Sequence, residues 1–237
     1  MAAKSIWIFG YGSIIWKAGF PHRKKLYGFI KGYRRVWWQG STDHRGTPEA
    51  PGRTLTLAED PDAYTWGAAY ELDGTFEEQQ KTLEYLEWRE KQYDIRRQVD
   101  LLSLPNVTNG TASLSASVDE ELPDPQVLVS GASLLDKAAC IASQREPSKE
   151  PEVLVKDCLV YIAGPDKTRN PNYLGPASIE DIAHQIAMSV GPSGPNCEYL
   201  FGIAQYLRDK GIVDEEMFEM ERIVRDIVAK RVSEKIT

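Results

Sequence analysis

The sequence has little of the chemistry on which disulfide-stabilised and metal-binding proteins depend. It contains three cysteines, Cys140, Cys158 and Cys197. It also contains three histidines, His22, His44 and His184. The odd, unpaired cysteines indicate neither a disulfide framework nor a zinc site, and the scattered histidines do not cluster as metal ligands would. We therefore expect no metal site and a reduced, cytoplasmic environment.

Positive charge and long apolar runs are also scarce. Lysine and arginine number 28 against 35 aspartates and glutamates, which gives a formal net charge of -7. Binding to nucleic acid would require a basic patch, so this partner is not expected. No apolar stretch approaches the ~20 residues of a membrane-spanning helix. Residues 1–5 are too short and too polar for a signal peptide. The expected partner is therefore neither a nucleic acid nor a membrane.

The chain does contain a dense pattern of secondary-structure signals. Its 237 residues, 42% of them hydrophobic, suffice for one sizeable core or at most two small ones. Apolar and alternating segments predict strands at 6–10, 53–57, 64–72, 93–102 and 153–162. Caps and helical periodicity predict helices at 76–91, 178–190, from about 196, and at about 214–235. Thr75 and Glu78 form a capping box before the first helix. Strands followed by helices favour an α+β fold.

Residues 103–152 differ in composition from the rest of the chain. This segment is rich in Ser, Ala, Pro and Glu and contains no aromatic residue. Such a composition buries little apolar surface, so it predicts a low-complexity, mobile insertion with one short helix near 134–143. We interpret residues 1–237 as a single domain that carries this insertion.

The segment WIFGYGSIIW near the N-terminus is an apolar run interrupted by Gly10-Tyr11-Gly12-Ser13. It does not match a dinucleotide-binding fingerprint, because Ile15 stands where the third glycine would be. Two glycines permit positive φ and let a ligand approach the main chain. The N–H groups at a strand end can then form an anion or oxyanion site. A plain turn out of a strand explains the tetrapeptide equally well.

A serine hydrolase mechanism has weak support in the sequence. No Gly-x-Ser-x-Gly elbow occurs. Ser13, Asp43 and His44 supply the residue types of a catalytic triad, but an aspartate adjacent in sequence to its histidine does not easily orient it. We expect each histidine to be structural or at the surface.

Six longer segments follow one another along the chain: FGYGSIIWK, GYRRVWWQGSTDHRGTPEAPGRTLTL, WGAAYEL, YLEWREKQYD, NYLGPASIEDIAHQI and GPSGPNCEYL. In their order and spacing they resemble the ChaC-type, glutathione-specific gamma-glutamylcyclotransferases. The resemblance covers about residues 6–97 and 153–228 and lapses across the insertion. It implies a small mixed β-barrel with helices packed around it. Ile14, where leucine is commoner, is a conservative departure.

The resemblance also implies a substrate, a reaction and a site. The substrate would be glutathione, and the products 5-oxoproline and Cys-Gly, which makes the enzyme a lyase of glutathione turnover. The loop that grips the gamma-glutamyl group corresponds to Ile8, Phe9, Gly10, Tyr11, Gly12 and Ser13. The catalytic glutamate corresponds to Glu90. No cofactor is implied.

Glu90 also suits a catalytic base on physical grounds. It stands in the last turn of the predicted helix, where the helix dipole should raise its pKa. Arg89 and Lys91 would oppose that shift if they point the same way. Arg45 and Tyr199 could each clamp the substrate or brace the loop, and the sequence does not decide between these roles.

Two other functions remain open. A hydrolase or transpeptidase of gamma-glutamyl peptides would use Ser13 as a nucleophile. A regulatory binding protein would need no catalysis at all. The sequence leaves both a monomer and a dimer open.

Overall fold

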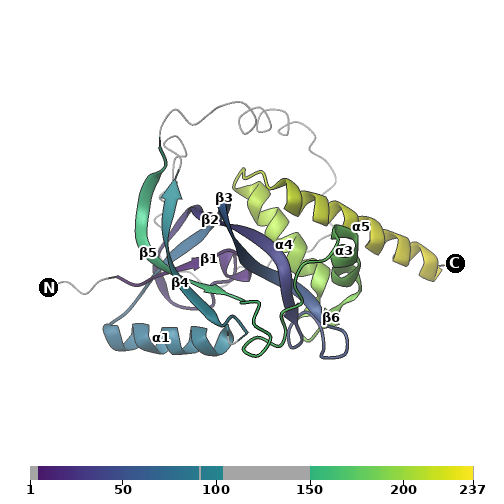
Figure 1. The fold of residues 1–237 in the computed structure, drawn as a ribbon, viewed down its shortest axis with the longest axis horizontal. Coiled ribbons are helices and arrows are strands. Elements are labelled where there is room, and N and C mark those ends of the chain that lie inside the picture. Colours follow the sequence, from purple (N-terminus) through teal and green to yellow (C-terminus); the bar gives the residue numbers. More distant parts are fainter. Residues whose placement is uncertain (1–4, 91, 104–149, 237) are drawn as a thin grey trace.

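The structure is a computed structural model that describes residues 5–90, 92–103 and 150–236. Five strands close into a barrel in the order β1-β3-β2-β4-β5 (Figure 1). Their bounds are Trp7–Gly10 (β1), His22–Ser41 (β2), Gly52–Leu72 (β3), Ile95–Ser103 (β4) and Glu152–Ile162 (β5). β1 and β5 pair in parallel, whereas the other pairs are antiparallel. The barrel is therefore mixed, which confirms the predicted fold class.

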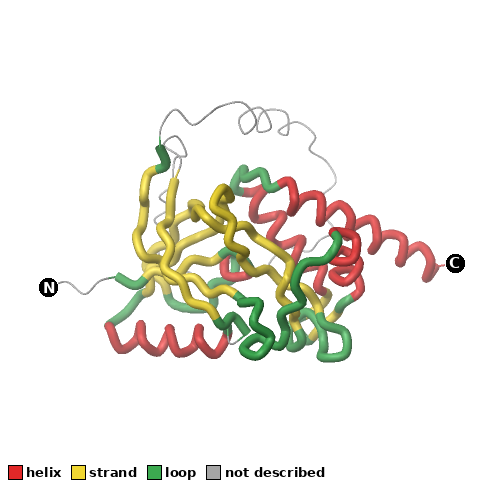
Figure 2. Tube along the Cα trace, in the orientation of Figure 1, coloured by secondary structure: helices red, strands yellow, loops and turns green. Residues whose placement is uncertain are grey.

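The helices lie on two sides of this barrel. Their bounds are Phe76–Arg89 (α1), Ile179–Met188 (α3), Asn196–Asp209 (α4) and Glu215–Ile236 (α5). In the view of Figure 2, α1 lies below the barrel, and α3, α4 and α5 gather beside it. A 3-10 turn, η1 (Ser13–Ile15), follows β1, and the short strands β6 (Val190–Gly191) and β7 (Gly194–Pro195) pair before α4. No helix of the described residues is long and apolar enough to cross a membrane.

The strands β2 and β3 differ most from the sequence prediction. β2 was not predicted at all, and the two strands predicted at 53–57 and 64–72 are one continuous strand. Register shifts interrupt the pairing of β2 with β3 between Lys31 and Tyr33, where the partner jumps from Tyr64 to Glu59. A bulge of this kind breaks the period-two pattern by which a strand is recognised in sequence. The bulge also accommodates Pro61, which cannot donate a ladder hydrogen bond.

The helix signals of the sequence are confirmed more closely. Thr75 accepts a hydrogen bond from the N–H of Glu78 at 3.4 Å, and the Glu78 carboxylate accepts one from the N–H of Thr75 at 2.7 Å. This capping box begins α1, which ends at Arg89 rather than at the predicted residue 91. The predicted apolar face of the last helix is buried at Met217, Met220 and Val224.

The core fills the barrel and continues beneath α3 and α4. Ile8 and Phe9 of β1 are both buried in this core, and Leu200, Ile203 and Leu207 bring α4 against the same cluster. Full burial of an aliphatic or aromatic side chain of this size contributes about 1.5–3 kcal/mol. This packing fixes the end of β1, from which the glycine-containing loop emerges.

The predicted insertion begins where β4 ends and finishes where β5 begins. Ser103 of β4 stands opposite Glu152 of β5 in the antiparallel ladder. Residues 104–149, including the helix predicted near 134–143, lie outside the described residues.

Candidate active site

A small pocket lies at the end of β1 where the glycine-containing loop begins. Its volume is about 40 Å³. It is lined by Phe9, Gly10, Tyr11, Gly12, Ser13, Ile14, Leu55, Glu90, Tyr93, Tyr161 and Tyr199. The structure thus brings five of the six predicted loop residues together with the predicted catalytic glutamate. Ile8, the sixth, is fully buried in the barrel wall opposite Tyr70 and, among the described residues, is not part of the pocket lining.

Hydrogen bonds to its carbonyl groups hold the loop in place. The Tyr70 hydroxyl lies 2.7 Å from the carbonyl oxygens of both Ile14 and Ile15, which share its single proton. Lys25 Nζ donates to the Ile15 carbonyl at 2.6 Å. Arg35 Nε donates to the Tyr11 carbonyl at 3.1 Å. Side chains of β2 and β3 therefore bind the carbonyl groups of Tyr11, Ile14 and Ile15.

Arg35 is a supporting residue that the sequence analysis did not identify. Its side chain is only 5% exposed, and its Nη1 donates to Asp214 at 2.9 Å, just before α5. The same guanidinium donates to the carbonyl of Trp66 in β3. One buried cation thus connects the loop, the barrel and the last helix. Truncating one partner of such an ion pair is costly because it leaves the other charge buried.

The unused donors of the loop are those of Gly12 and Ser13. Within the described part of the chain, neither main-chain N–H donates to a carbonyl or side-chain oxygen. Unpaired N–H groups that line a pocket are suited to binding a carboxylate or a developing oxyanion.

At Gly12 the structure contradicts one of the two reasons that the sequence analysis gave for a glycine. Its φ is -116°, so the expectation of positive φ is wrong at this residue. A Cβ atom at this position would instead lie 2.7 Å from the hydroxyl oxygen of Tyr199. The requirement for glycine is therefore one of space between the loop and α4.

Glu90 enters the pocket as the C-cap residue of α1, directly after its last helical residue. Its side chain is 14% exposed. Burial raises the pKa of Glu90, and the attraction of Arg89, whose Nε lies 3.1 Å from its carboxylate, lowers it less than burial raises it. The sequence analysis predicted the same direction of shift for the Glu90 pKa. It attributed the shift to the helix dipole, whereas burial is the main cause. Lys91 lies outside the described residues.

Arg89 connects α1 to the loop and thereby places its neighbour. Its Nη1 donates to the carbonyl of Ala18 at 2.6 Å, and its Nη2 donates to the Lys17 carbonyl at 3.3 Å. Nη2 also lies 3.5 Å from Ser13 Oγ. These bonds fix the end of α1 beside the residues that follow η1.

Four tyrosines surround the carboxyl group of Glu90. Burial raises the pKa of Tyr11, Tyr93, Tyr161 and Tyr199, and the charge of Glu90 contributes to each shift. The four therefore stay protonated as hydrogen-bond donors at neutral pH. Within the described residues, the Tyr161 hydroxyl is buried without a partner. Tyr11 donates to the Tyr161 carbonyl at 2.7 Å.

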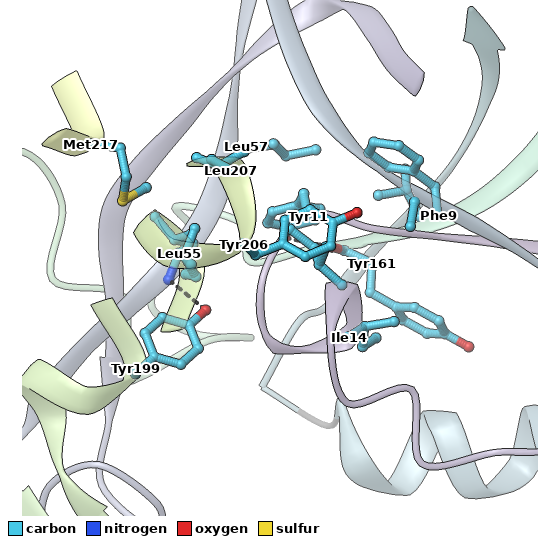
Figure 3. Close-up of a cluster of buried hydrophobic side chains, with 14 of the residues drawn as sticks. Phe9, Tyr11, Ile14, Leu55, Leu57, Tyr161, Tyr199, Tyr206, Leu207 and Met217 are labelled. Atoms are coloured by element: carbon cyan, nitrogen blue, oxygen red, sulfur yellow. Dashed lines mark hydrogen bonds between the residues drawn. The ribbon is translucent and has the colours of Figure 1, made fainter. Parts of the chain in front are cut away.

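Tyr199 joins the pocket from α4. Its hydroxyl oxygen accepts a hydrogen bond from the N–H of Leu55 at 3.4 Å, drawn as the dashed line in Figure 3. Because the Tyr199 oxygen is the acceptor in this bond, the Tyr199 hydroxyl proton points away from Leu55. Tyr199 therefore lines the pocket beside Gly12 of the loop. Arg45 instead braces a neighbouring segment, because its Nη1 donates to the Pro195 carbonyl and to Glu198, each at 3.0 Å.

The residue types of a serine triad are present but are not assembled. The ring of His44 contacts Ser193 Oγ at 3.3 Å, and Asp43 accepts a hydrogen bond from Gln92 at 3.2 Å. Within the described residues no hydrogen bond joins Ser13 to His44. The same part of the chain contains no group of three or more His, Cys, Asp or Glu side chains that could hold a metal ion.

A larger cavity, which we call the vestibule, adjoins the pocket. Its volume is about 470 Å³. Both cavities are lined by Ser13, Glu90, Tyr93 and Tyr199. The rest of the vestibule is lined by Trp16, Lys17, Gly19, Ser41, Asp43, His44, Arg45, Thr54, Tyr85, Trp88, Arg89, Gln92 and Ser193. A ligand held in the pocket therefore has room to continue past Glu90.

A comparison of this barrel with solved structures indicates the class of protein, because one of them has the same fold. The crystal structure of a gamma-glutamyl cyclotransferase specific to glutathione from yeast matches this structure with a TM-score of 0.66 and 27% sequence identity. The match covers 95% of this chain and all of that one.

Sequence comparison then identifies the family. The model of the ChaC-like protein family matches residues 6–227. Gamma-glutamylcyclotransferase 2-3 of Arabidopsis thaliana is 41% identical over 226 residues, which cover 95% of this chain and 92% of that protein. Glutathione-specific gamma-glutamylcyclotransferase 1 of Danio rerio is 37% identical over 221 residues, with coverage of 92% and 87%. The chain belongs to the ChaC-like family.

Proposed function

We propose that this protein is a glutathione-specific gamma-glutamylcyclotransferase, a lyase that degrades glutathione to 5-oxoproline and Cys-Gly. Family membership and the names of its relatives support the activity. The observation that carries the proposal is the pocket itself. It combines one buried carboxyl group of raised pKa, that of Glu90, with unused main-chain donors at Gly12 and Ser13.

The reaction is an intramolecular acyl transfer. The alpha-amino nitrogen of the substrate attacks its own gamma-carbonyl carbon, and this new C–N bond closes a five-membered lactam. The C–N bond to the cysteine residue then breaks, and Cys-Gly leaves as an amine. Because the substrate supplies its own nucleophile, the enzyme needs no catalytic serine. The separation of Ser13 from His44 is consistent with this chemistry.

Glu90 acts as the base and then as the acid. The substrate amine is mostly an ammonium ion at neutral pH and cannot attack until it loses a proton. A carboxylate of raised pKa is a better proton acceptor, and its protonated form can deliver that proton to the departing amine. The attacking nitrogen loses a second proton to solvent as the lactam forms, so Glu90 is ionised again for the next turnover.

The loop from Phe9 to Ser13 binds the gamma-glutamyl group. The N–H groups of Gly12 and Ser13 stabilise substrate oxygens, including the oxyanion of the tetrahedral intermediate. In other enzymes each such donor contributes about 2.7–4 kcal/mol to the transition state. Because Lys25, Arg35 and Tyr70 bind the carbonyl groups of the loop, its N–H groups are already in position before the substrate binds.

Incubation of the purified protein with glutathione tests the proposal. We expect 5-oxoproline and Cys-Gly in equal amounts, without a covalent intermediate. Glutamate as the product, or transfer of the gamma-glutamyl group to an added amino acid, would support the alternative that uses Ser13. Absence of turnover together with glutathione binding would support a regulatory binding protein.

We further propose that the chain is one catalytic domain and that residues 106–149 are dispensable. Ser103 and Glu152 already stand opposite each other in the β4–β5 ladder, so a short Gly/Ser linker can join the flanking strands. Closing a shorter loop is entropically slightly favourable. We expect the deletion variant to retain activity within a few-fold and to melt at the same or a higher temperature. A folded but inactive variant would mean that the insertion contributes to the site.

A cytoplasmic location accompanies this proposal. Cys158 and Cys197 are free thiols, and Cys158 is buried. Unpaired cysteines are common where the thiol pool is kept reduced.

A further inference from the structure

The vestibule is the part of the site that the proposed reaction does not explain. The pocket, at about 40 Å³, accommodates only the reacting end of a tripeptide. If the gamma-glutamyl group occupies it, as the proposed function requires, the Cys-Gly portion extends past Glu90 into the vestibule of about 470 Å³. A protein that distinguishes glutathione from other gamma-glutamyl peptides must recognise this portion, because the gamma-glutamyl group is common to all of them.

The feature that sets this portion apart is the position of its carboxylate, because in a gamma-glutamyl dipeptide the terminal carboxylate lies one residue closer to the reacting amide. The glycine residue ends in a free carboxylate, so glutathione carries one net negative charge at neutral pH. A cationic side chain in the vestibule is the group best suited to recognise it. Among the described residues that line the vestibule, three carry such side chains, Lys17, Arg45 and Arg89, although the chain as a whole has a net charge of -7.

Two of the three cations are already paired. Arg89 Nε lies 3.1 Å from the Glu90 carboxylate, and Arg45 Nη1 lies 3.0 Å from that of Glu198. For Lys17, by contrast, no carboxylate of the described residues lies within 4.0 Å of the ammonium group. Among the described residues Lys17 therefore has no ion-pair partner, unlike Arg45 and Arg89.

The main chain of Lys17 is held close to the reacting groups. Its N–H donates to the Ser13 carbonyl at 2.9 Å, and its carbonyl accepts from Arg89 Nη2 at 3.3 Å. The same arginine neighbours Glu90. The flexible side chain of Lys17 thus starts from a fixed point between the binding loop and the end of α1.

We propose that Lys17 binds the glycine carboxylate of the substrate and that the vestibule is the subsite for the Cys-Gly portion. A charge-assisted hydrogen bond at a partly exposed site corresponds to about a tenfold preference for a carboxylate over a neutral group. The interaction is remote from the bond that reacts, so it lowers KM for glutathione and leaves kcat almost unchanged.

The test compares glutathione with its C-terminal amide, which differs only in the charge of this group. For the wild type we expect kcat/KM to be about tenfold higher for glutathione. In Lys17→Met the ratio should fall to near one, with the loss in KM for glutathione, whereas Lys17→Arg should largely keep the ratio. Lys24→Met is the matched control, because it removes the same charge from an exposed residue of β2 outside the vestibule.

The outcomes separate this inference from the function on which it rests. If the wild type releases no 5-oxoproline from either compound, the proposed function fails and the subsite with it. If the wild type acts on both equally, only the carboxylate subsite is wrong. A tenfold ratio that persists in a cooperatively melting Lys17→Met variant would overturn the assignment to Lys17.

Discussion

A Glu90→Gln variant should lose about 10²–10⁴ in kcat/KM for glutathione, the usual contribution of a general base, while its circular dichroism spectrum stays unchanged. The amide is nearly isosteric with the carboxylate but cannot accept the ammonium proton. Glu90 is also the C-cap of α1 and contributes its main chain to the helix end, which the substitution preserves. The measurement is the initial rate of 5-oxoproline release at saturating and at limiting glutathione.

The matched control is Glu84→Gln on the same helix. Glu84 is exposed and lines neither cavity, so this variant removes an equal charge without touching the site. We expect its rate to equal that of the wild type. Turnover by Glu90→Gln within a few-fold of the wild type would remove Glu90 from the role of base.

The Glu90→Gln substitution should increase the stability of the folded protein at neutral pH, although it decreases the activity. Burial raises the pKa of Glu90 in the folded state, so the wild type loses stability as the pH rises from the ordinary carboxyl value of about 4.3 through that raised pKa. The Glu90→Gln variant has no such titration. Its melting temperature should exceed that of the wild type at neutral pH and converge with it in acid. A difference independent of pH would show that Glu90 is not desolvated in the folded protein.

The sequence predicted those parts of the fold that depend on local signals. The capping box of Thr75 and Glu78 and the apolar face of α5 are local, and both are confirmed. β2 was missed because its register shifts break the alternation of side chains along the strand. Closure of the barrel, with β1 between β3 and β5, depends on pairing between distant segments and came only from the resemblance to a family.

The site was predictable to a similar extent. Two glycines close together at a strand end indicated the loop, and the Arg-Glu pair indicated the base through the family resemblance. Of the four tyrosines, Tyr93 and Tyr161 were not predicted, because residues far apart in sequence meet here: Tyr11 and Tyr161 are joined across 150 residues. Arg35 was missed for the same reason: an arginine pair in sequence gives no sign that one member is buried against Asp214.

The loop model also predicts an order of severity between two neighbouring substitutions, which separates it from a serine mechanism. In Ser13→Ala, the lost hydroxyl lies 3.5 Å from Arg89 Nη2 and adds at most one hydrogen bond. A bond of this kind corresponds to about a two- to thirteenfold loss of kcat/KM. The serine-nucleophile alternative instead predicts that Ser13→Ala is inactive.

Gly12→Val should reduce kcat/KM for glutathione by about 10²-fold or more, because small displacements of a binding group have effects of this size. The new Cβ would meet the Tyr199 hydroxyl at 2.7 Å, so the loop, the Tyr199 side chain or α4 must shift, and we expect the N–H groups of Gly12 and Ser13 to lose their alignment. Both variants are assayed after a cooperative melt has been recorded.

Tyr199→Phe is combined with Gly12→Ala to remove the clashing oxygen, and partial recovery relative to Gly12→Ala alone is expected. Near-normal turnover by Gly12→Val beside an inactive Ser13→Ala would contradict the main-chain model and favour a serine nucleophile.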